Sequence, residues 1–228
     1  MARLSRYGGW RRIVHLALYG LAGVAALAAT PVRAAGPLIW ALGDSLTAGY
    51  GLPPADGFTV QLEAALHRAG VPATVRNGGI SGDTSAQGEA RLKWGLRGLG
   101  AAPDLVILEL GANDMLRGLP PAQAEVHLDN ILAELQQLHI RVLIAGMKAA
   151  PNLGPDYRRA FDAIYPRLAQ RHGAALYPFF LDGVAGNRAL IQADGLHPNA
   201  RGVTIIVGRM LPAVKAVLAK SRPSIRGG

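Results

Sequence analysis

Short apolar runs alternate along this chain with longer segments in which apolar residues recur about every 3.6 positions. The runs are rich in Val, Ile and Leu, as buried strands are, and the longer segments have the period of amphipathic helices. Such alternation is typical of strand and helix units around a parallel sheet. The sequence therefore predicts an α/β fold, a three-layer α/β/α sandwich with a central parallel sheet of about five strands. Strands are expected at residues 38–42, 74–76, 105–110, 141–147 and 174–177.

Helical segments are expected at residues 58–69, after the pair Pro120-Pro121, at 156–172 and at 200–220. Two of them have clear apolar stripes, and Gly70 is expected to end the first helix. The stripes are Phe58, Leu62, Ala65, Leu66 and Ala69, and then Val126, Ile131, Leu132, Leu135 and Leu138. Because no repeat or composition shift divides the chain, residues 35–228 are expected to form a single domain, with a flexible tail at 220–228.

The first 34 residues have the order of a secretory signal peptide. Arg residues precede an apolar run at 13–29, and Val32 and Ala34 then occupy positions where a processing enzyme requires small side chains. The alternative is an uncleaved membrane anchor, because the run approaches the roughly 18 to 20 apolar residues that span a bilayer. His15 and two Gly residues interrupt the run, which favours cleavage after Ala34 and a periplasmic or secreted protein without a stable membrane anchor.

Composition excludes several classes of function. The chain has no Cys, so disulfides, thiolate catalysis and Cys-bound metals are excluded. Its formal net charge is +9, but the first 34 residues hold five Arg and no acidic residue, which leaves +4 on residues 35–228. The remaining basic residues are dispersed without interleaved aromatic residues, so no nucleic-acid partner is expected.

In a parallel sheet, reactive groups gather at the carboxyl ends of the strands. Gly43-Asp44-Ser45 follows the first expected strand, where a Gly permits a sharp turn and a Ser hydroxyl can project into the crevice. The same residues also form ordinary helix-capping turns. Near the end of the chain, Asp194 precedes His197 by three residues, so its carboxylate can orient the imidazole. A capped loop with an unrelated His is the alternative there.

Two further polar segments, Gly78 to Thr84 and Gly111 to Asp114, also follow expected strands. A Gly backbone N–H and an Asn amide can stabilise an oxyanion, although a plain turn is the better explanation of either segment taken alone. Neither has the Gly-Lys-Ser/Thr ending of a phosphate loop, and the chain has no Gly-x-Ser-x-Gly nucleophile elbow. No His-x-His or His-Glu-x-x-His pair is present, so no metal is expected.

Taken together and in this order, the four segments resemble the blocks of the SGNH, or GDSL, hydrolase family. The likeness runs from about Leu38 to Leu218 and is nearest to the bacterial thioesterase I, lysophospholipase and arylesterase branch. One departure is Ala112, where close relatives often have Gly. The blocks are Gly43-Asp44-Ser45-Leu46, Ile80-Ser81-Gly82-Asp83-Thr84-Ser85, Glu109-Leu110-Gly111-Ala112-Asn113-Asp114 and Asp194-Gly195-Leu196-His197-Pro198-Asn199.

The resemblance implies a flavodoxin-like SGNH-hydrolase fold and a catalytic triad of Ser45 as nucleophile, His197 as general base and acid, and Asp194 as its orienting group. It also implies an oxyanion hole made of the Ser45 N–H, the Gly82 N–H and the Asn113 amide. The implied substrate-binding stretch follows that Asn and consists of Asp114, Met115, Leu116, Arg117 and Gly118.

The activity implied is hydrolysis of aryl or lipid esters, and of acyl thioesters, through an acyl-serine intermediate. Such chemistry requires no metal or organic cofactor, and the partner is a small-molecule or lipid ester substrate. A monomer is the default expectation. Two alternatives stay open: an O-acetylesterase of carbohydrate or peptidoglycan, and a ligand-binding module that keeps the fold without catalysis.

Overall fold

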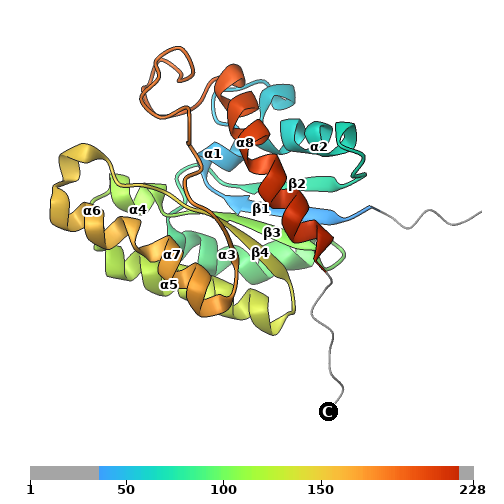
Figure 1. Cartoon of the computed structure of the whole chain (residues 1–228). Coiled ribbons are helices and arrows are strands. Elements are labelled where there is room, and N and C mark those ends of the chain that lie inside the picture. The colour runs from blue at the N-terminus through green and yellow to red at the C-terminus, as the bar shows by residue number, and fades with distance from the viewer. Residues whose placement is uncertain (1–35, 221–228) are drawn as a thin grey trace, which may run out of the picture. The chain divides into compact units, whose positions relative to one another are not determined.

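The computed structural model describes residues 36–220. The expected signal peptide at 1–34 and almost all of the expected tail at 220–228 therefore lie outside the described residues. Strands and helices alternate along the chain (Figure 1). The strands are β1 (Leu38–Gly43), β2 (Thr74–Gly79), β3 (Leu105–Glu109), β4 (Arg141–Ala145) and β5 (Ala175–Tyr177). The helices are α1 (Ser45–Ala48), α2 (Phe58–Arg68), α3 (Ser85–Gly98), α4 (Ala112–Leu116), α5 (Pro121–Gln137), α6 (Pro155–Asp162), α7 (Ile164–His172) and α8 (Ala200–Ala219), with 3₁₀ turns η1 (Pro54–Asp56) and η2 (Pro151–Leu153).

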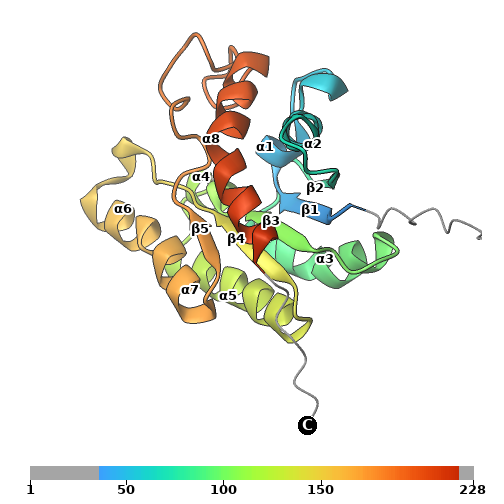
Figure 2. The ribbon, with the colours of Figure 1, turned by 45° about the vertical axis from the view of Figure 1, so that its right-hand side comes forward.

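All five strands run parallel, in the order β2-β1-β3-β4-β5. Helices α2 and α8 cover one face of the sheet, and α3, α5 and α7 cover the other, as the two views in Figures 1 and 2 show. The predicted three-layer sandwich with a five-stranded parallel sheet is thereby confirmed. This strand order places β1 next to β3, at the point where the chain connections leave in opposite directions.

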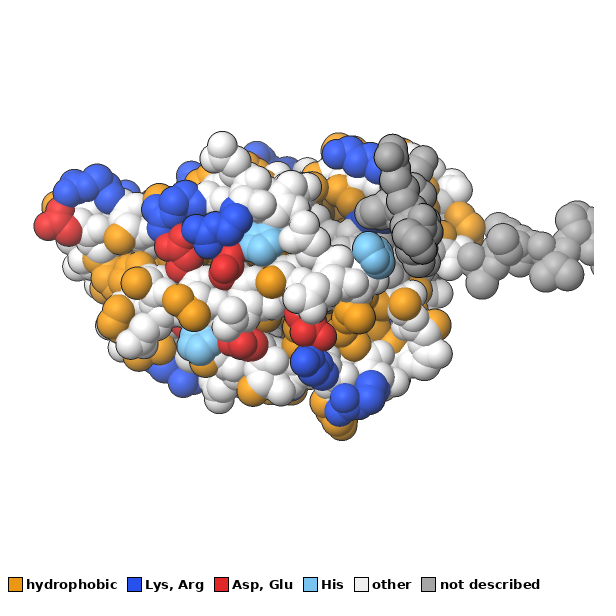
Figure 3. Space-filling model, turned by 90° about the horizontal axis from the view of Figure 1, so that it is seen from below, with side chains coloured by type: hydrophobic (Ala, Val, Ile, Leu, Met, Phe, Trp, Pro, Cys, Tyr) orange, Lys and Arg blue, Asp and Glu red, His pale blue; other side chains and the backbone are white. Residues whose placement is uncertain are grey.

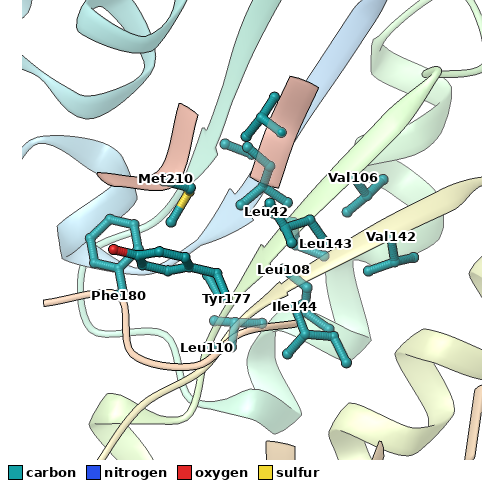
Figure 4. Close-up of a cluster of buried hydrophobic side chains, with 14 of the residues drawn as sticks. Leu42, Val106, Leu108, Leu110, Val142, Leu143, Ile144, Tyr177, Phe180 and Met210 are labelled. Carbon is teal, nitrogen blue, oxygen red and sulfur yellow. The ribbon is translucent and has the colours of Figure 1, made fainter. Parts of the chain in front are cut away.

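The core fills the space between the sheet and its helices. All five residues of β3 are buried, as expected of a central parallel strand that is covered on both faces. Figure 4 shows part of this core, with buried side chains of β1, β3, β4 and β5 on the two faces of the sheet, together with Phe180 from a later loop and Met210 from α8. The side chains labelled there are Leu42, Val106, Leu108, Leu110, Val142, Leu143, Ile144, Tyr177, Phe180 and Met210.

Helix α8 is long and apolar enough to cross a membrane by length and composition. Its apolar residues have another explanation, because one face of α8 packs against α2, β4 and β5. Val203, Ile206, Met210 and Val214 are at most 2% exposed there. The apolar character of this helix is therefore that of a core helix.

The expected helical segment at 156–172 consists of two helices, α6 and α7, with a break at Ala163. Pro166 lacks a backbone N–H and cannot donate to the carbonyl of Asp162, so the helical hydrogen-bond ladder is interrupted here. The Asp162 carboxylate accepts a hydrogen bond from the backbone N–H of Ala149, at 2.7 Å. That bond ties the break to the loop after β4.

Three residues assigned to apolar stripes face solvent instead: Ala69 at the end of α2, and Val126 and Leu138 on α5. On α5 the buried face is made by Ala124, Leu128, Ile131, Leu132 and Leu135. Periodicity predicted the correct helix but a stripe that was too wide. Helix α3 was not predicted at all, because most of its residues are polar or small and only Ser85, Gly88 and Leu92 are buried.

On the face seen in Figure 3, Lys and Arg side chains lie close to Asp and Glu side chains. Ion pairs also join α7 to α5. Arg167 on α7 pairs with Glu125 on α5, and Arg171 pairs with Asp129 one turn further along. These basic residues therefore contribute to the packing of α7 on α5.

Candidate active site

The four polar segments meet at the carboxyl edge of the sheet. Ser45 follows β1, Gly82 lies in the loop after β2, and Asn113 follows β3. Because β1 is the neighbour of both β2 and β3, these three loops lie side by side. The segment that carries Asp194 and His197 precedes α8 and completes the group through its contact with Ser45. This is where ligands bind in open α/β sheets.

Ser45, His197 and Asp194 form a continuous hydrogen-bonded chain. Ser45 Oγ lies 2.8 Å from His197 Nε2, and His197 Nδ1 lies 2.6 Å from Asp194 Oδ2. The two ring nitrogens therefore have different partners, which is the arrangement that lets a carboxylate orient an imidazole towards a hydroxyl. The structure thus brings together three residues that the sequence separates by as much as 152 positions.

The Asp194 carboxylate has three donors around it. Its Oδ1 accepts hydrogen bonds from the backbone N–H groups of Leu196 and His197, at 2.9 and 3.0 Å. These two backbone bonds, with the His197 side chain next, lower the pKa of Asp194 from its ordinary value of 3.8 to about 2. Because the folded pKa is depressed, any stability this group contributes is present above pH 3.8 and is lost as the pH falls through about 2.

Gln192 fixes the loop that carries His197. Its backbone N–H donates to the carbonyl of His197 at 2.7 Å, and its side-chain amide donates to the carbonyls of Tyr50 and Pro198. The Tyr50 ring lies 4.6 Å from the imidazole, centroid to centroid. His197 is therefore held from its backbone and from one ring face. No role was expected for Gln192 or Tyr50 from the sequence, because their contacts join segments that lie far apart in the chain.

Two backbone N–H groups near Ser45 have no acceptor among residues 36–220, those of Ser45 and Gly82. Ser45 is the first residue of α1, and Asp44 caps this helix by accepting from the N–H of Leu46 at 3.0 Å. Gly82 has a φ of +89°, a conformation that only glycine adopts easily. Both N–H groups are thus available as oxyanion donors.

The third expected donor, Asn113, is engaged. Its Nδ2 donates to Asp44 Oδ2 and to the carbonyl of Asp83, both at 3.0 Å. The sequence predicted a donor directed at the substrate, and the structure adds two protein acceptors for the same amide. To serve as an oxyanion donor, Asn113 must share or exchange one of these two hydrogen bonds with the substrate oxygen.

The expected substrate-binding stretch divides into two parts. Met115 and Leu116 line the cavity beside Ser45. Asp114 is buried and accepts from the N–H and the hydroxyl of Ser85, at 2.8 and 2.6 Å, so it joins α4 to α3. Arg117 and Gly118 do not line the cavity, and Arg117 donates instead to the carbonyl of Gly82 at 2.6 Å.

The cavity that opens at Ser45 has a volume of about 570 Å³, within the size range of small-molecule sites. Apolar side chains make most of its wall. Its polar lining residues include Ser45, Asn113 and His197. Such a wall favours an acyl chain or an aromatic group over a sugar. The apolar lining includes Leu46, Met115, Leu116, Met147, Phe179 and Ile191. Among residues 36–220, no three His, Cys, Asp or Glu side chains lie close enough together to hold a metal ion.

Fold and site are those of a serine hydrolase that acts on ester bonds. Comparison with known proteins agrees. Residues 41–205 match the model of the GDSL-like lipase/acylhydrolase family. The chain is 38% identical over 198 residues to esterase TesA of Pseudomonas aeruginosa, a match that covers 87% of this chain and 98% of that protein. It is 41% identical over 157 residues to an arylesterase of Vibrio mimicus, a match that covers 69% of this chain and 78% of that protein.

Solved structures give the same result. The crystal structure of AlinE4, an SGNH-hydrolase family esterase, is 48% identical with a TM-score of 0.69, covering 81% of this chain and 98% of that chain. A crystal structure of TesA is 38% identical with a TM-score of 0.75, covering 79% of this chain and 99% of that chain. The chain belongs to the GDSL-like lipase/acylhydrolase family.

Proposed function

We propose that this enzyme is an exported esterase that hydrolyses aryl or lipid esters, and acyl thioesters, with Ser45, His197 and Asp194 as its triad. The observation that carries the proposal is the unbroken chain from Asp194 Oδ2 to Ser45 Oγ, which opens on an apolar cavity. A hydroxyl so placed can pass its proton to the imidazole while its oxygen attacks a carbonyl carbon.

In the proposed first step, Ser45 Oγ forms a bond to the acyl carbon and His197 Nε2 takes the hydroxyl proton. The carbonyl oxygen becomes an oxyanion that accepts from the N–H groups of Ser45 and Gly82 and from the Asn113 amide. His197 then gives its proton to the leaving alcohol or thiol. Water attacks the acyl-serine by the same route, which releases the acid and restores Ser45.

The cavity predicts that acyl chains longer than acetyl are preferred, because each buried CH₂ contributes about 0.8 kcal/mol. The test is kcat/KM for p-nitrophenyl esters from acetyl to palmitoyl, measured with a protein that begins at Ala35, alongside an acyl-CoA and an acetylated glycan. We expect the rate to rise from acetyl to medium-length chains. A clear preference for the glycan would replace this proposal by the O-acetylesterase alternative.

Replacing Asn113 by Ala is expected to cost about 3 kcal/mol of transition-state stabilisation, seen mainly as a lower kcat, because one oxyanion donor is lost. Asn113 also holds Asp44 and the loop at Asp83, so thermal unfolding of the variant is measured in parallel. The matched control is Asn130→Ala, which removes an exposed amide that lies on α5 and donates to Glu89. If the Asn113→Ala variant kept the full kcat, Asn113 would not be an oxyanion donor.

Export rests on residues 1–34 and stays part of the proposal. Expression of the full chain in a bacterial host with a periplasm, followed by fractionation and mass measurement, tests it. A periplasmic protein whose first residue is Ala35 is expected. A product that keeps residues 1–34 and stays with the membrane fraction would support the anchor alternative.

A further inference from the structure

Glu109 has an ionisable side chain and is fully buried. It ends β3, beside β1, and its exposed fraction is 0%. Its Oε2 accepts hydrogen bonds from the Thr47 hydroxyl at 2.7 Å and from the backbone N–H of Asp44 at 3.3 Å. Its Oε1 has no hydrogen-bond partner among the described residues. The mechanism proposed above does not use this residue.

A second buried carboxyl, that of Asp44, lies directly next to it. Asp44 is also 0% exposed, and its oxygens accept from Leu46 N–H and from the Asn113 amide. Among residues 36–220, neither carboxyl forms an ion pair with Lys or Arg. Two ionised carboxylates in such a place repel each other and are costly to bury, so one proton is favoured on the pair.

The surroundings indicate which member holds that proton. Burial raises the pKa of Glu109 well above its usual range, and the charge of Asp44 raises it further. Burial also raises the pKa of Asp44, to about 6, but the hydrogen bond from Leu46, the nearby His197 and the side chains of Glu109 and Asn113 oppose this shift. Titratable groups near the pair include Tyr165 on α7 and, through the carbonyl of Gly43, Arg91 on α3, whose charge is paired with Asp83.

We propose that Glu109 is a positioning residue that stays protonated in the working enzyme and leaves Asp44 as the one buried carboxylate that holds Asn113 and the first turn of α1. A single negative charge suffices to accept from the Asn113 amide. A second charge beneath the oxyanion hole would oppose the negative charge that develops on the substrate. The inference rests on the proposed roles of Ser45 and Asn113.

Protonation is tested on the resting protein by NMR, with ¹³C placed at the carboxyl carbons of its five glutamates. At neutral pH we expect one glutamate signal at the position of a protonated acid, and we expect Glu109→Gln to remove that signal. Glu125, which pairs with Arg167, provides the ionised reference in the same spectrum. A Glu109 signal in the ionised position at neutral pH would overturn the inference.

Kinetics then test the positioning role. A Gln carbonyl can replace Oε2 as acceptor for Thr47 and Asp44 without adding charge, so Glu109→Gln is expected to keep kcat within about threefold. Glu109→Ala removes the acceptor, and we expect kcat to fall by about tenfold or more with KM changed far less. The Asn113 side-chain amide signal is expected to move in the Ala variant and to stay in place in the Gln variant.

If Glu109→Ala does not fold, the NMR result and the Glu109→Gln variant still test whether Glu109 is protonated and acts as a positioning residue. A Gln variant with a large loss of kcat at unchanged stability would show that the carboxyl is needed ionised, and it would overturn the inference. A failure of the proposed function would look different, because hydrolysis would then not depend on Ser45. The protonation state of Glu109 would still be measured on the unreacted protein.

Discussion

Replacing Ser45 by Ala is expected to lower kcat for ester hydrolysis by about 10⁶-fold, as loss of a nucleophilic serine does in other triad enzymes. The reason is that His197 Nε2 would then face a methyl group, and no oxygen would remain to form the acyl intermediate. Hydrolysis of a p-nitrophenyl ester by matched preparations of the two proteins gives the ratio. A fluorophosphonate, which needs an activated serine, is expected to label the original enzyme and not the Ser45→Ala variant.

Ser81→Ala is the matched control for this change. Ser81 lines the same cavity but makes no hydrogen bond to His197 among the described residues. We expect this variant to lose at most about tenfold in kcat/KM, since it removes a hydroxyl without removing the nucleophile. Hydrolysis that persists in Ser45→Ala at a rate near that of the original enzyme would refute the proposed mechanism and favour a ligand-binding protein with a contaminating activity.

Replacing Asp194 by Asn is expected to lower kcat by about 10⁴-fold while leaving the fold intact. An Asn oxygen can still accept from the N–H groups of Leu196 and His197, so the turn is kept. The Asn amide, however, would donate to His197 Nδ1 and place the ring proton on Nε2, facing Ser45. This tautomer cannot accept the proton of the serine hydroxyl. Single-turnover kinetics with the same ester measures the loss.

The control for this substitution is Asp182→Asn. Asp182 pairs with Arg209 at the surface, with both side chains about half exposed, so its loss is expected to change kcat little and stability by at most about 1 kcal/mol. If Asp194→Asn kept most of the activity while the control behaved as expected, the imidazole would have to be oriented by another group, and the proposed role of Asp194 would be wrong.

Much of the fold could be predicted from the sequence because parallel strands that are buried on both faces leave a strong signal. The run that became β3 is almost purely aliphatic, and all of it is buried. Strand β2 was assigned as residues 74–76 and in fact continues to Gly79, because its partner β1 pairs with it as far as Gly43. The end of β2 therefore depends on its pairing with β1, which cannot be predicted from the composition of residues 77–79 alone.

Helix α3 shows a different limit. Its first turn has a capping box, in which Thr84 and Gln87 satisfy each other's backbone groups, and this pattern could have been recognised. The rest of the helix is largely polar and exposes Trp94, so hydrophobic periodicity gave no support for it. In contrast, Pro166 was visible in the sequence as a residue that interrupts a helix.

The candidate site was predictable where local motifs carry it. Asp194 and His197 are three residues apart and share one turn, so their contact follows from the chain itself. The network beneath the site was not predictable in this way. Glu109 meets Asp44 and Thr47 because β3 pairs with β1 in a register that aligns Glu109 with Gly43. A lone carboxylate within an aliphatic run was the available signal, and its partners depend on tertiary structure.

Because Ser45 and His197 lie far apart along the chain, the catalytic contact between them requires a completely folded domain. The hydroxyl and the imidazole are 152 residues apart and meet at 2.8 Å only when β1, the sheet and the segment before α8 have all assembled. A chain that is threaded unfolded through a membrane channel therefore carries no active nucleophile. In the export that we propose, esterase activity would therefore begin only after the chain has crossed the membrane and folded.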